Sequence, residues 1–125
     1  MKTIETQNAP AAIGPYSQAT VSGGLVYSSG QIPVDPVSGK IESEDIKGQT
    51  KQAIRNLSAV LAAAGSSLER VVTTTCFLKN MGDFAAFNEI YASCFPGRPA
   101  RSCVEVSALP KGALVEIEAV AETVE

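Results

Sequence analysis

The sequence predicts an α+β fold, a two-layer sandwich in which two helices cover one face of a sheet. Two segments follow a helical period, and several short runs rich in β-branched and aromatic residues surround them. The predicted order is strand, strand, helix, strand, helix, strand, strand. With 125 residues, of which 45% are hydrophobic, the chain has the size of a single domain, 1–125, with one core.

The N-terminal part is predicted to contain an extended arm followed by a hairpin. Residues 8–16 hold two prolines and a glycine, which favour ordered extended backbone over a helix. The runs 18–21 and 25–30 are separated by Ser22-Gly23-Gly24, a turn sequence that suits a β-hairpin.

The first helix is predicted over residues 45–64. Ser43 is the expected N-cap, and Gly65 is the expected residue that ends the helix in the left-handed conformation. The apolar stripe of this helix comprises Ile46, Ala53, Ile54, Leu57, Val60, Leu61 and Ala64.

The C-terminal half predicts a strand, a helix and two further strands. Residues 70–79 suit a central strand buried on both faces, because they are β-branched and aromatic. A second helix is expected to be capped by Asp83 and ended by Pro96. Strands at about 102–107 and 113–121 are expected to pair as a hairpin. The apolar side of the second helix comprises Phe84, Phe87, Tyr91 and Cys94 or Phe95.

Composition argues against several kinds of partner. The formal net charge of −3 and the absence of a basic run do not suit nucleic-acid binding. No stretch approaches the roughly 18 apolar residues that cross a membrane. The N-terminus has neither a signal core nor an Arg-rich transit character, so a cytoplasmic protein is expected.

Cysteine and histidine usage narrows the chemistry. Cys76, Cys94 and Cys103 lack CxxC spacing and are odd in number, which favours reduced thiols in a reducing compartment. The chain contains no histidine, which is the commonest zinc ligand and the usual partner of a catalytic Ser or Cys. Neither a metal site nor a Ser-His-Asp hydrolase is expected.

The sheet face away from the helices predicts an oligomer. Strand 70–79 is largely uncharged on both faces, and an apolar, Thr-bearing face is costly to leave in water. Burial against other copies of the chain is the simplest solution. In the last strand, Val115, Ile117, Ala119 and Ala121 point one way, while Leu114, Glu116, Glu118 and Val120 point the other.

Arg101 and Glu116 are the leading candidates for chemistry. The expected hairpin would bring a fixed cation and a carboxylate close together, which suits a small acidic substrate that needs an anchor and proton transfer. A carboxylate inside a strand requires a partner or a role. Structural alternatives stay open, because Arg101 could form an ion pair with Glu105 and Glu116 could share a solvated edge with Glu118.

Four further residues are weaker candidates. Tyr16 follows Gly-Pro, where a packed ring with a surface hydroxyl is the usual structural role. Ser29 precedes a glycine, as turn residues do, and Asn88 is disfavoured in a helix unless it bonds across the fold. Cys103 resembles a small buried hydrophobe, and only Arg101 could lower the pKa of its thiol.

The segment Pro99-Ala-Arg-Ser-Cys-Val-Glu-Val106, followed by Val115-Glu-Ile-Glu118, is a highly specific motif. With it the chain closely resembles the RidA/YjgF family of enamine/imine deaminases, also called 2-iminobutanoate/2-iminopropanoate deaminases. Further matching segments are 8–16, 29–33, 63–65, 71–75, 83–84, 87–91 and 109–111.

This resemblance implies a chorismate-mutase-like fold with a mixed sheet. It also implies a homotrimer in which the sheets line a central barrel, with each site in a cleft between subunits and no cofactor or metal. Arg101 then corresponds to the arginine that binds the substrate carboxylate, and Glu116 to the acid that positions or activates water. The connection 94–99 looks short beside many relatives, so pocket shape could differ. Pocket-lining positions match Tyr16, Ser29 and Asn88, and backbone groups that hold water and substrate match Gly30 and Cys103.

The implied activity is hydrolysis of reactive 2-enamino and 2-imino acids, such as 2-aminoacrylate, 2-iminopropanoate and 2-iminobutanoate, to 2-keto acids and ammonia. Such an enzyme removes metabolites that damage pyridoxal-phosphate enzymes. One alternative is a trimer that binds keto acids and acts as a regulator or chaperone without turnover. Another is a nuclease or translation inhibitor, against which the acidic balance and missing histidines argue.

Overall fold

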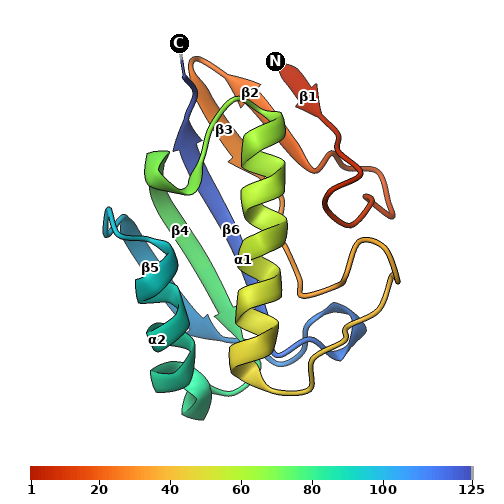
Figure 1. Cartoon of the computed structure of the whole chain (residues 1–125), viewed down its shortest axis with the longest axis vertical. Helices are drawn as coiled ribbons and strands as arrows, with labels where there is room; N and C mark the ends of the chain where they lie inside the picture. The colour runs from red at the N-terminus through yellow and green to blue at the C-terminus, as the bar shows by residue number, and fades with distance from the viewer. Residues whose placement is uncertain (125) are drawn as a thin grey trace.

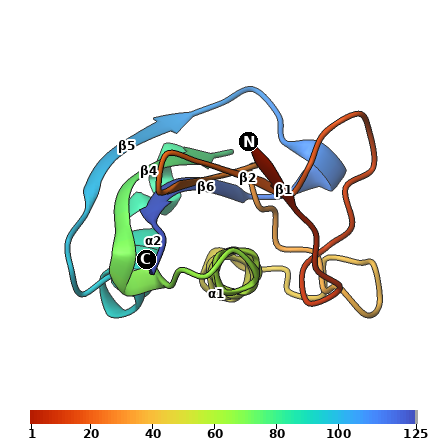
Figure 2. The same ribbon diagram turned by 90° about the horizontal axis from the view of Figure 1, so that it is seen from above.

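The computed structural model describes residues 1–124 and contains one six-stranded mixed sheet with two helices on the same face (Figures 1 and 2). The strand order is β1-β2-β3-β6-β4-β5, which confirms the predicted α+β fold class. Glu125, the last residue of the expected domain, lies outside the described residues. The elements are β1 (Lys2–Ile4), β2 (Ala19–Ser22), β3 (Leu25–Ser28), α1 (Ile46–Ala63), β4 (Val71–Leu78), α2 (Phe84–Cys94), β5 (Ala100–Glu105) and β6 (Val115–Glu122).

The two C-terminal strands do not pair with each other, so the predicted hairpin is wrong. β4, α2 and β5 form a crossover unit in which β5 runs parallel to β4, with Arg101 opposite Thr74. β6 pairs antiparallel with the other edge of β4, where Ala119 lies opposite Thr74. A helical connection such as α2 allows parallel pairing, and β6 then gains β3 and β4 as partners on its two edges.

The N-terminal hairpin is confirmed, with one addition. β2 and β3 pair antiparallel across Gly23 and Gly24, whose φ angles of 60° and 78° suit glycine in a tight turn. The short strand β1, which the sequence pattern does not predict, extends the sheet by pairing with β2. The arm over residues 8–16 has no helix or strand.

The N-cap of helix α1 lies two residues after the expected one. Asp45, not Ser43, is the N-cap, because its carboxylate accepts a hydrogen bond from the Gly48 amide at 2.7 Å. The Ser43 hydroxyl instead donates to Asp45 Oδ1 at 3.3 Å. The expected end is confirmed, since Gly65 follows the C-cap with a φ of 78°.

Helix α2 has no side-chain cap, so the expected role of Asp83 is wrong. A 3₁₀ turn over Met81–Asp83 leads directly into the helix and places Asp83 itself in a helical conformation. Its side chain therefore makes no cap hydrogen bond. None of the helices within residues 1–124 is long and apolar enough to span a membrane.

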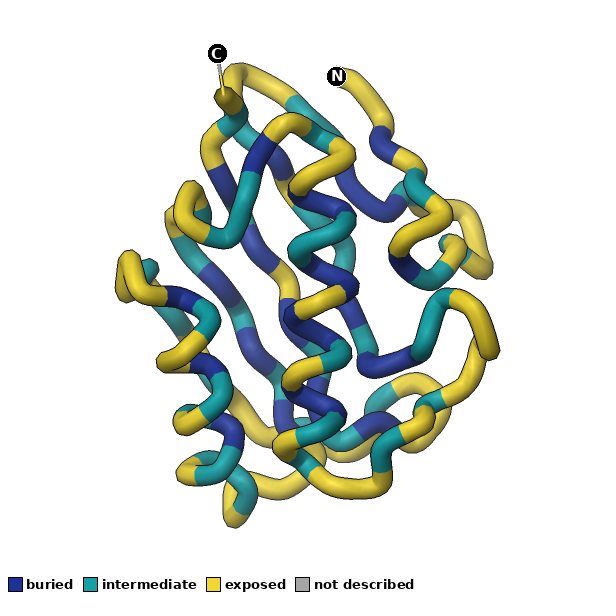
Figure 3. Tube along the Cα trace, in the orientation of Figure 1, coloured by how far each residue is buried: buried dark blue, intermediate teal, exposed yellow. Residues whose placement is uncertain are grey.

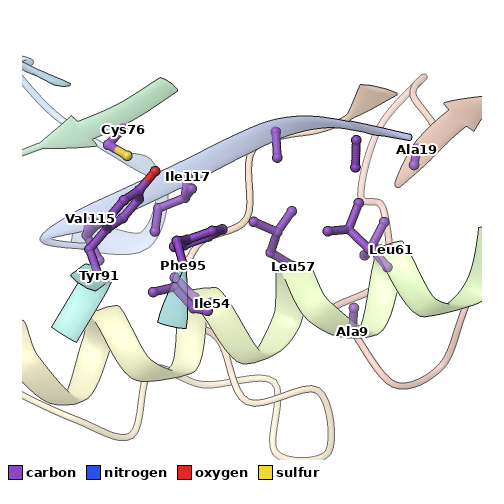
Figure 4. Close-up of a cluster of buried hydrophobic side chains, with 14 of the residues drawn as sticks. Ala9, Ala19, Ile54, Leu57, Leu61, Cys76, Tyr91, Phe95, Val115 and Ile117 are labelled. Atoms are coloured by element: carbon purple, nitrogen blue, oxygen red, sulfur yellow. The ribbon is translucent and has the colours of Figure 1, made fainter. Parts of the chain in front are cut away.

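The core lies between the helices and the sheet. Buried residues line the inner side of α1 and alternate along β4 and β6 (Figure 3). Side chains of α1, such as Leu57, point toward β6, which contributes Ile117 and Val115, and Tyr91 of α2 and Phe95 just after it lie beside them (Figure 4).

The opposite face of the sheet is only partly covered. On β4, Thr74, Cys76 and Leu78 are buried, whereas Thr73, Thr75 and Phe77 are half-buried, so burial of both faces is wrong within one chain. On the same outer face, Tyr27 is 45% exposed and Val104 is 44% exposed. Burial of this face against other copies stays a prediction.

Candidate functional site

Four of the seven candidate residues line one cavity. Tyr16, Ser29, Gly30 and Glu116, here called the glutamate cluster, border a hollow of about 740 Å³. Its other walls come from the N-terminal arm, from the loop after β3 and from the 110–111 turn. A second hollow of about 890 Å³ runs along residues 3–18 and shares Tyr16, but no other candidate residue lines it.

An isolated β-bridge brings Gly30 to Glu116. Gln31 pairs with Ile117 of β6 through two backbone hydrogen bonds of 2.8 and 3.1 Å, so the backbone just before Gln31 lies against the Glu116 side chain. A Cβ atom at Gly30 would overlap the Glu116 carboxylate. Glycine at position 30 therefore allows the backbone to approach the carboxylate closely.

The environment of Glu116 favours its protonated form. Burial raises the pKa of the Glu116 carboxyl, and the neighbouring charge of Glu118 raises it further. Among residues 1–124, no cation lies within salt-bridge distance of this carboxylate. A half-buried carboxyl with a raised pKa and no ion-pair partner is suited to proton transfer.

The two hydroxyls of the glutamate cluster have different freedom. The Ser29 hydroxyl donates to the Ser17 carbonyl at 2.6 Å, a bond that ties the end of β3 to the arm. The Tyr16 side chain is 52% exposed, and its hydroxyl accepts only a long bond of 3.4 Å from the Ile13 amide. Tyr16 is therefore the freer of the two to contact a ligand.

The other three candidates form a second group, here called the arginine cluster, of Asn88, Arg101 and Cys103. Arg101 Nη1 donates to Asn88 Oδ1 at 2.6 Å, between β5 and α2. The alternative ion pair with Glu105 does not form, because Glu105 Oε1 accepts from the Met81 amide. Within residues 1–124 the single salt bridge is Lys47–Glu89, so Arg101 has no carboxylate partner there.

Cys103 offers its backbone rather than its thiol. Burial raises the pKa of the Cys103 thiol, and the nearby Arg101 charge only partly opposes this, so the thiol is not activated. The Val106 amide donates to Leu78 of β4 at 2.9 Å. Since alternate residues of a strand direct their backbone groups to opposite sides, the Cys103 amide points away from β4 at the outer edge of the sheet.

The two clusters do not meet within one chain. Arg101 lies in register with Thr74 and Ala119, on the helix-bearing face of the sheet. Glu116 is three residues from Ala119 along β6, so its side chain points to the opposite face. The expectation that one hairpin holds both groups is wrong, because β4 lies between β5 and β6.

Sequence reasoning missed the aromatic surroundings of Arg101. The guanidinium lies 4.7 Å from the ring centroid of Tyr91, 5.4 Å from that of Phe84 and 5.9 Å from that of Phe87. The only signal for this was the spacing of these rings on one side of α2, which the pattern assigned to core packing alone. Nothing local indicates that β5 passes over that side.

Comparisons with known proteins agree with this architecture. The family model described as endoribonuclease L-PSP matches residues 6–123. A Lactococcus lactis protein named as a regulator, AldR, is 52% identical, with 98% of each chain covered. The Salmonella typhimurium 2-iminobutanoate/2-iminopropanoate deaminase is 49% identical, with 96% of each covered. The crystal structure of Escherichia coli TdcF with bound serine has a TM-score of 0.94 at 43% identity, and covers 99% of this chain and 100% of its own.

Proposed function

The chain belongs to the RidA/YjgF family, and on that premise we propose that it hydrolyses small 2-enamino and 2-imino acids to 2-keto acids and ammonia. The expected substrates are 2-aminoacrylate with its imine 2-iminopropanoate, and 2-iminobutanoate. The deaminase names carried by relatives such as the Salmonella protein support this reaction class.

The observation that carries the proposal is a guanidinium and a carboxyl group, neither of which has an ion-pair partner among residues 1–124. Within residues 1–124, the Arg101 guanidinium has no carboxylate and the Glu116 carboxyl has no cation. Each lies beside further groups that a small acid could use, Asn88 on one side and the Gly30 backbone on the other. A half-buried ionisable group without a partner is energetically costly. A bound small acid would supply a partner to both the guanidinium and the carboxyl.

We place the complete site between two copies of the chain. Arg101 and Glu116 lie on opposite faces of one sheet, so one chain cannot present both to one small molecule. The edge strand β5 and the partly apolar outer face are the surfaces through which copies would associate. The family resemblance supports a homotrimer, with the arginine cluster of one subunit facing the glutamate cluster of the next.

The proposed chemistry needs positioning and one acid–base group. The Arg101 guanidinium binds the substrate carboxylate through charge-assisted hydrogen bonds, and the Cys103 amide assists. The Glu116 carboxyl protonates the enamine carbon to give the imine. Its carboxylate and the Gly30 carbonyl then hold a water molecule, whose oxygen attacks the imine carbon as its proton passes through Glu116 to nitrogen. In the collapse of the carbinolamine, the Glu116 carboxylate takes up the hydroxyl proton as the C–N bond breaks, which releases ammonia and the 2-keto acid and restores the Glu116 carboxyl.

The test is keto-acid release when threonine dehydratase supplies the imine. Wild-type protein should accelerate keto-acid formation above the spontaneous rate. Arg101→Ala should lower kcat/KM about 10²-fold, since it removes two charge-assisted bonds. Arg98→Ala is the matched control, because Arg98 is an exposed arginine three residues away. The proposal is excluded if wild type forms keto acid no faster than the spontaneous reaction, or if Arg101→Ala keeps full activity.

A second candidate function is a keto-acid-binding regulator without turnover, favoured by the relative named as a regulator, AldR. Arg101 could bind a keto acid whether the protein is an enzyme or a regulator. Glu116→Gln separates the two: lost turnover with retained keto-acid binding supports the enzyme. Binding by wild type with no turnover supports the regulator.

A further inference from the structure

Three aromatic rings of α2 surround the Arg101 guanidinium. Tyr91 is the nearest, with its ring centroid 4.7 Å from the guanidinium carbon, and Phe84 and Phe87 lie 5.4 and 5.9 Å away. Each distance is within the range of a cation–π interaction, which attracts the flat face of a guanidinium. The rings therefore restrict where the Arg101 guanidinium can lie.

Tyr91 is itself fixed from several directions. Its hydroxyl is hydrogen-bonded to Thr74 Oγ1 of β4 at 2.6 Å, and both residues are buried. Burial raises the pKa of the Tyr91 hydroxyl, which therefore stays neutral. Its ring stacks on Phe95 at 4.3 Å and lies 5.6 Å from Phe87. In Figure 4 the ring lies beside Cys76 and Val115 with its hydroxyl directed toward the sheet.

The same arrangement leaves part of the guanidinium available. Arg101 carries five N–H donors in a fixed plane, and Asn88 Oδ1 is its hydrogen-bond acceptor within residues 1–124. Aromatic faces attract the charge without occupying the N–H edge. A guanidinium whose charge is attracted by neighbouring rings, and which keeps N–H donors beyond the one given to Asn88, can receive a carboxylate.

We infer that Tyr91 is a positioning residue for the substrate carboxylate: its ring, held mainly by packing on Phe95 and Phe87, orients Arg101 so that the free N–H groups meet the ligand. For its ligand the inference rests on the proposed function. For the orientation of Arg101 it depends only on the contacts within α2, β4 and β5.

The test compares Tyr91→Leu, which removes the ring, with Tyr91→Phe, which keeps the ring and loses the hydroxyl. Tyr91→Leu should weaken binding of 2-oxobutanoate about tenfold and raise KM similarly, with kcat within about twofold of wild type. Tyr91→Phe should bind within about threefold of wild type. Leu61→Ala, a buried α1 variant away from Arg101, controls for loss of core packing.

Two readouts separate positioning from a structural effect. In an Arg101→Ala background, Tyr91→Leu should have no further effect on 2-oxobutanoate binding. The Arg101 Nε–H signal in NMR spectra should be ordered in wild type and Leu61→Ala, and mobile in Tyr91→Leu. Equal weakening in both backgrounds, or an unchanged Nε–H signal, overturns the inference. Wild type that does not accelerate keto-acid release would refute the proposed function, while the Nε–H signal still decides the positioning role.

Discussion

Substitution of Gly30 by alanine tests the contact on which the proposed acid–base group depends. A Cβ at this position would lie 2.7 Å from Glu116 Cδ and 3.0 Å from Cγ. Carbon atoms pack at roughly 3.5–4.0 Å, so the Glu116 side chain must move by about an ångström. A displacement of that size at a reacting group costs about 10²-fold in rate, so kcat should fall about 10²-fold.

Stability should barely change in the same variant. Gly30 is not in the left-handed region, so alanine fits the backbone and reduces the entropy of the unfolded chain, a gain of about 0.4–1 kcal/mol. Moving Glu116 out of its preferred rotamer costs about 0.5–1.5 kcal/mol. These terms nearly cancel, so Tm should stay within about 5 °C of wild type.

The assays are keto-acid release and thermal unfolding of the two proteins side by side. Gly82→Ala is the matched control, since no neighbouring atom lies within 4 Å of its added Cβ and its backbone is also outside the left-handed region. It should keep wild-type activity. The reasoning is refuted if Gly30→Ala retains wild-type kcat, or if Gly82→Ala loses as much activity.

The raised pKa of Glu116 means that the folded chain holds this proton more tightly than the unfolded chain, so this group's contribution to stability falls as pH rises from about 4 through the raised value. Glu116→Gln should therefore unfold at a higher temperature than wild type at neutral pH, an advantage that disappears near pH 4 in thermal scans; equal Tm values at pH 7 would contradict it. Asn56→Ala should cost about 2–3 kcal/mol in urea unfolding, because its buried amide donates to two loop carbonyls at 3.0 and 2.8 Å. Asp45→Ala should cost about 1 kcal/mol by loss of the N-cap, while Ser43→Ala should cost less than half as much; the reverse order in the same assay would restore Ser43 as the cap.

Local patterns in the sequence predict the helices and the strand positions well. The apolar stripe of 45–64 and the glycine that ends it place α1 within one residue, because helix geometry and left-handed termination depend on neighbours in sequence. The β-branched run of 70–79 places β4 equally closely. The N-cap is predicted less well than the helix, because Ser43 and Asp45, two residues apart, both carry side-chain oxygens that can cap a helix.

Strand pairing could not be predicted in the same way. Consecutive strands joined by a short turn ordinarily form a hairpin, and nothing within 102–121 indicates that β4 separates them. That outcome depends on α2 returning β5 parallel to β4, and on β6 fitting between β3 and β4. The same nonlocal pairing decides that Arg101 and Glu116 belong to two clusters.

The candidate residues could be chosen from the sequence and the family resemblance, but their surroundings could not. The close approach of Gly30 to Glu116 depends on a bridge between Gln31 and Ile117, which are 86 positions apart in sequence numbering. The rings around Arg101 depend likewise on the crossover of β5 past α2. Neither contact leaves a local pattern, because each pairs segments brought together only by the finished sheet.

The placement of Arg101 and Glu116 on opposite faces of the sheet has a genetic consequence. On the proposed assembly, each complete site takes its arginine from one subunit and its glutamate from the next. Arg101→Ala and Glu116→Gln alleles, each inactive alone, should then complement when expressed together. Random mixing in equal amounts restores both residues at about a quarter of the sites. Each defective allele would thus supply the residue that the other lacks.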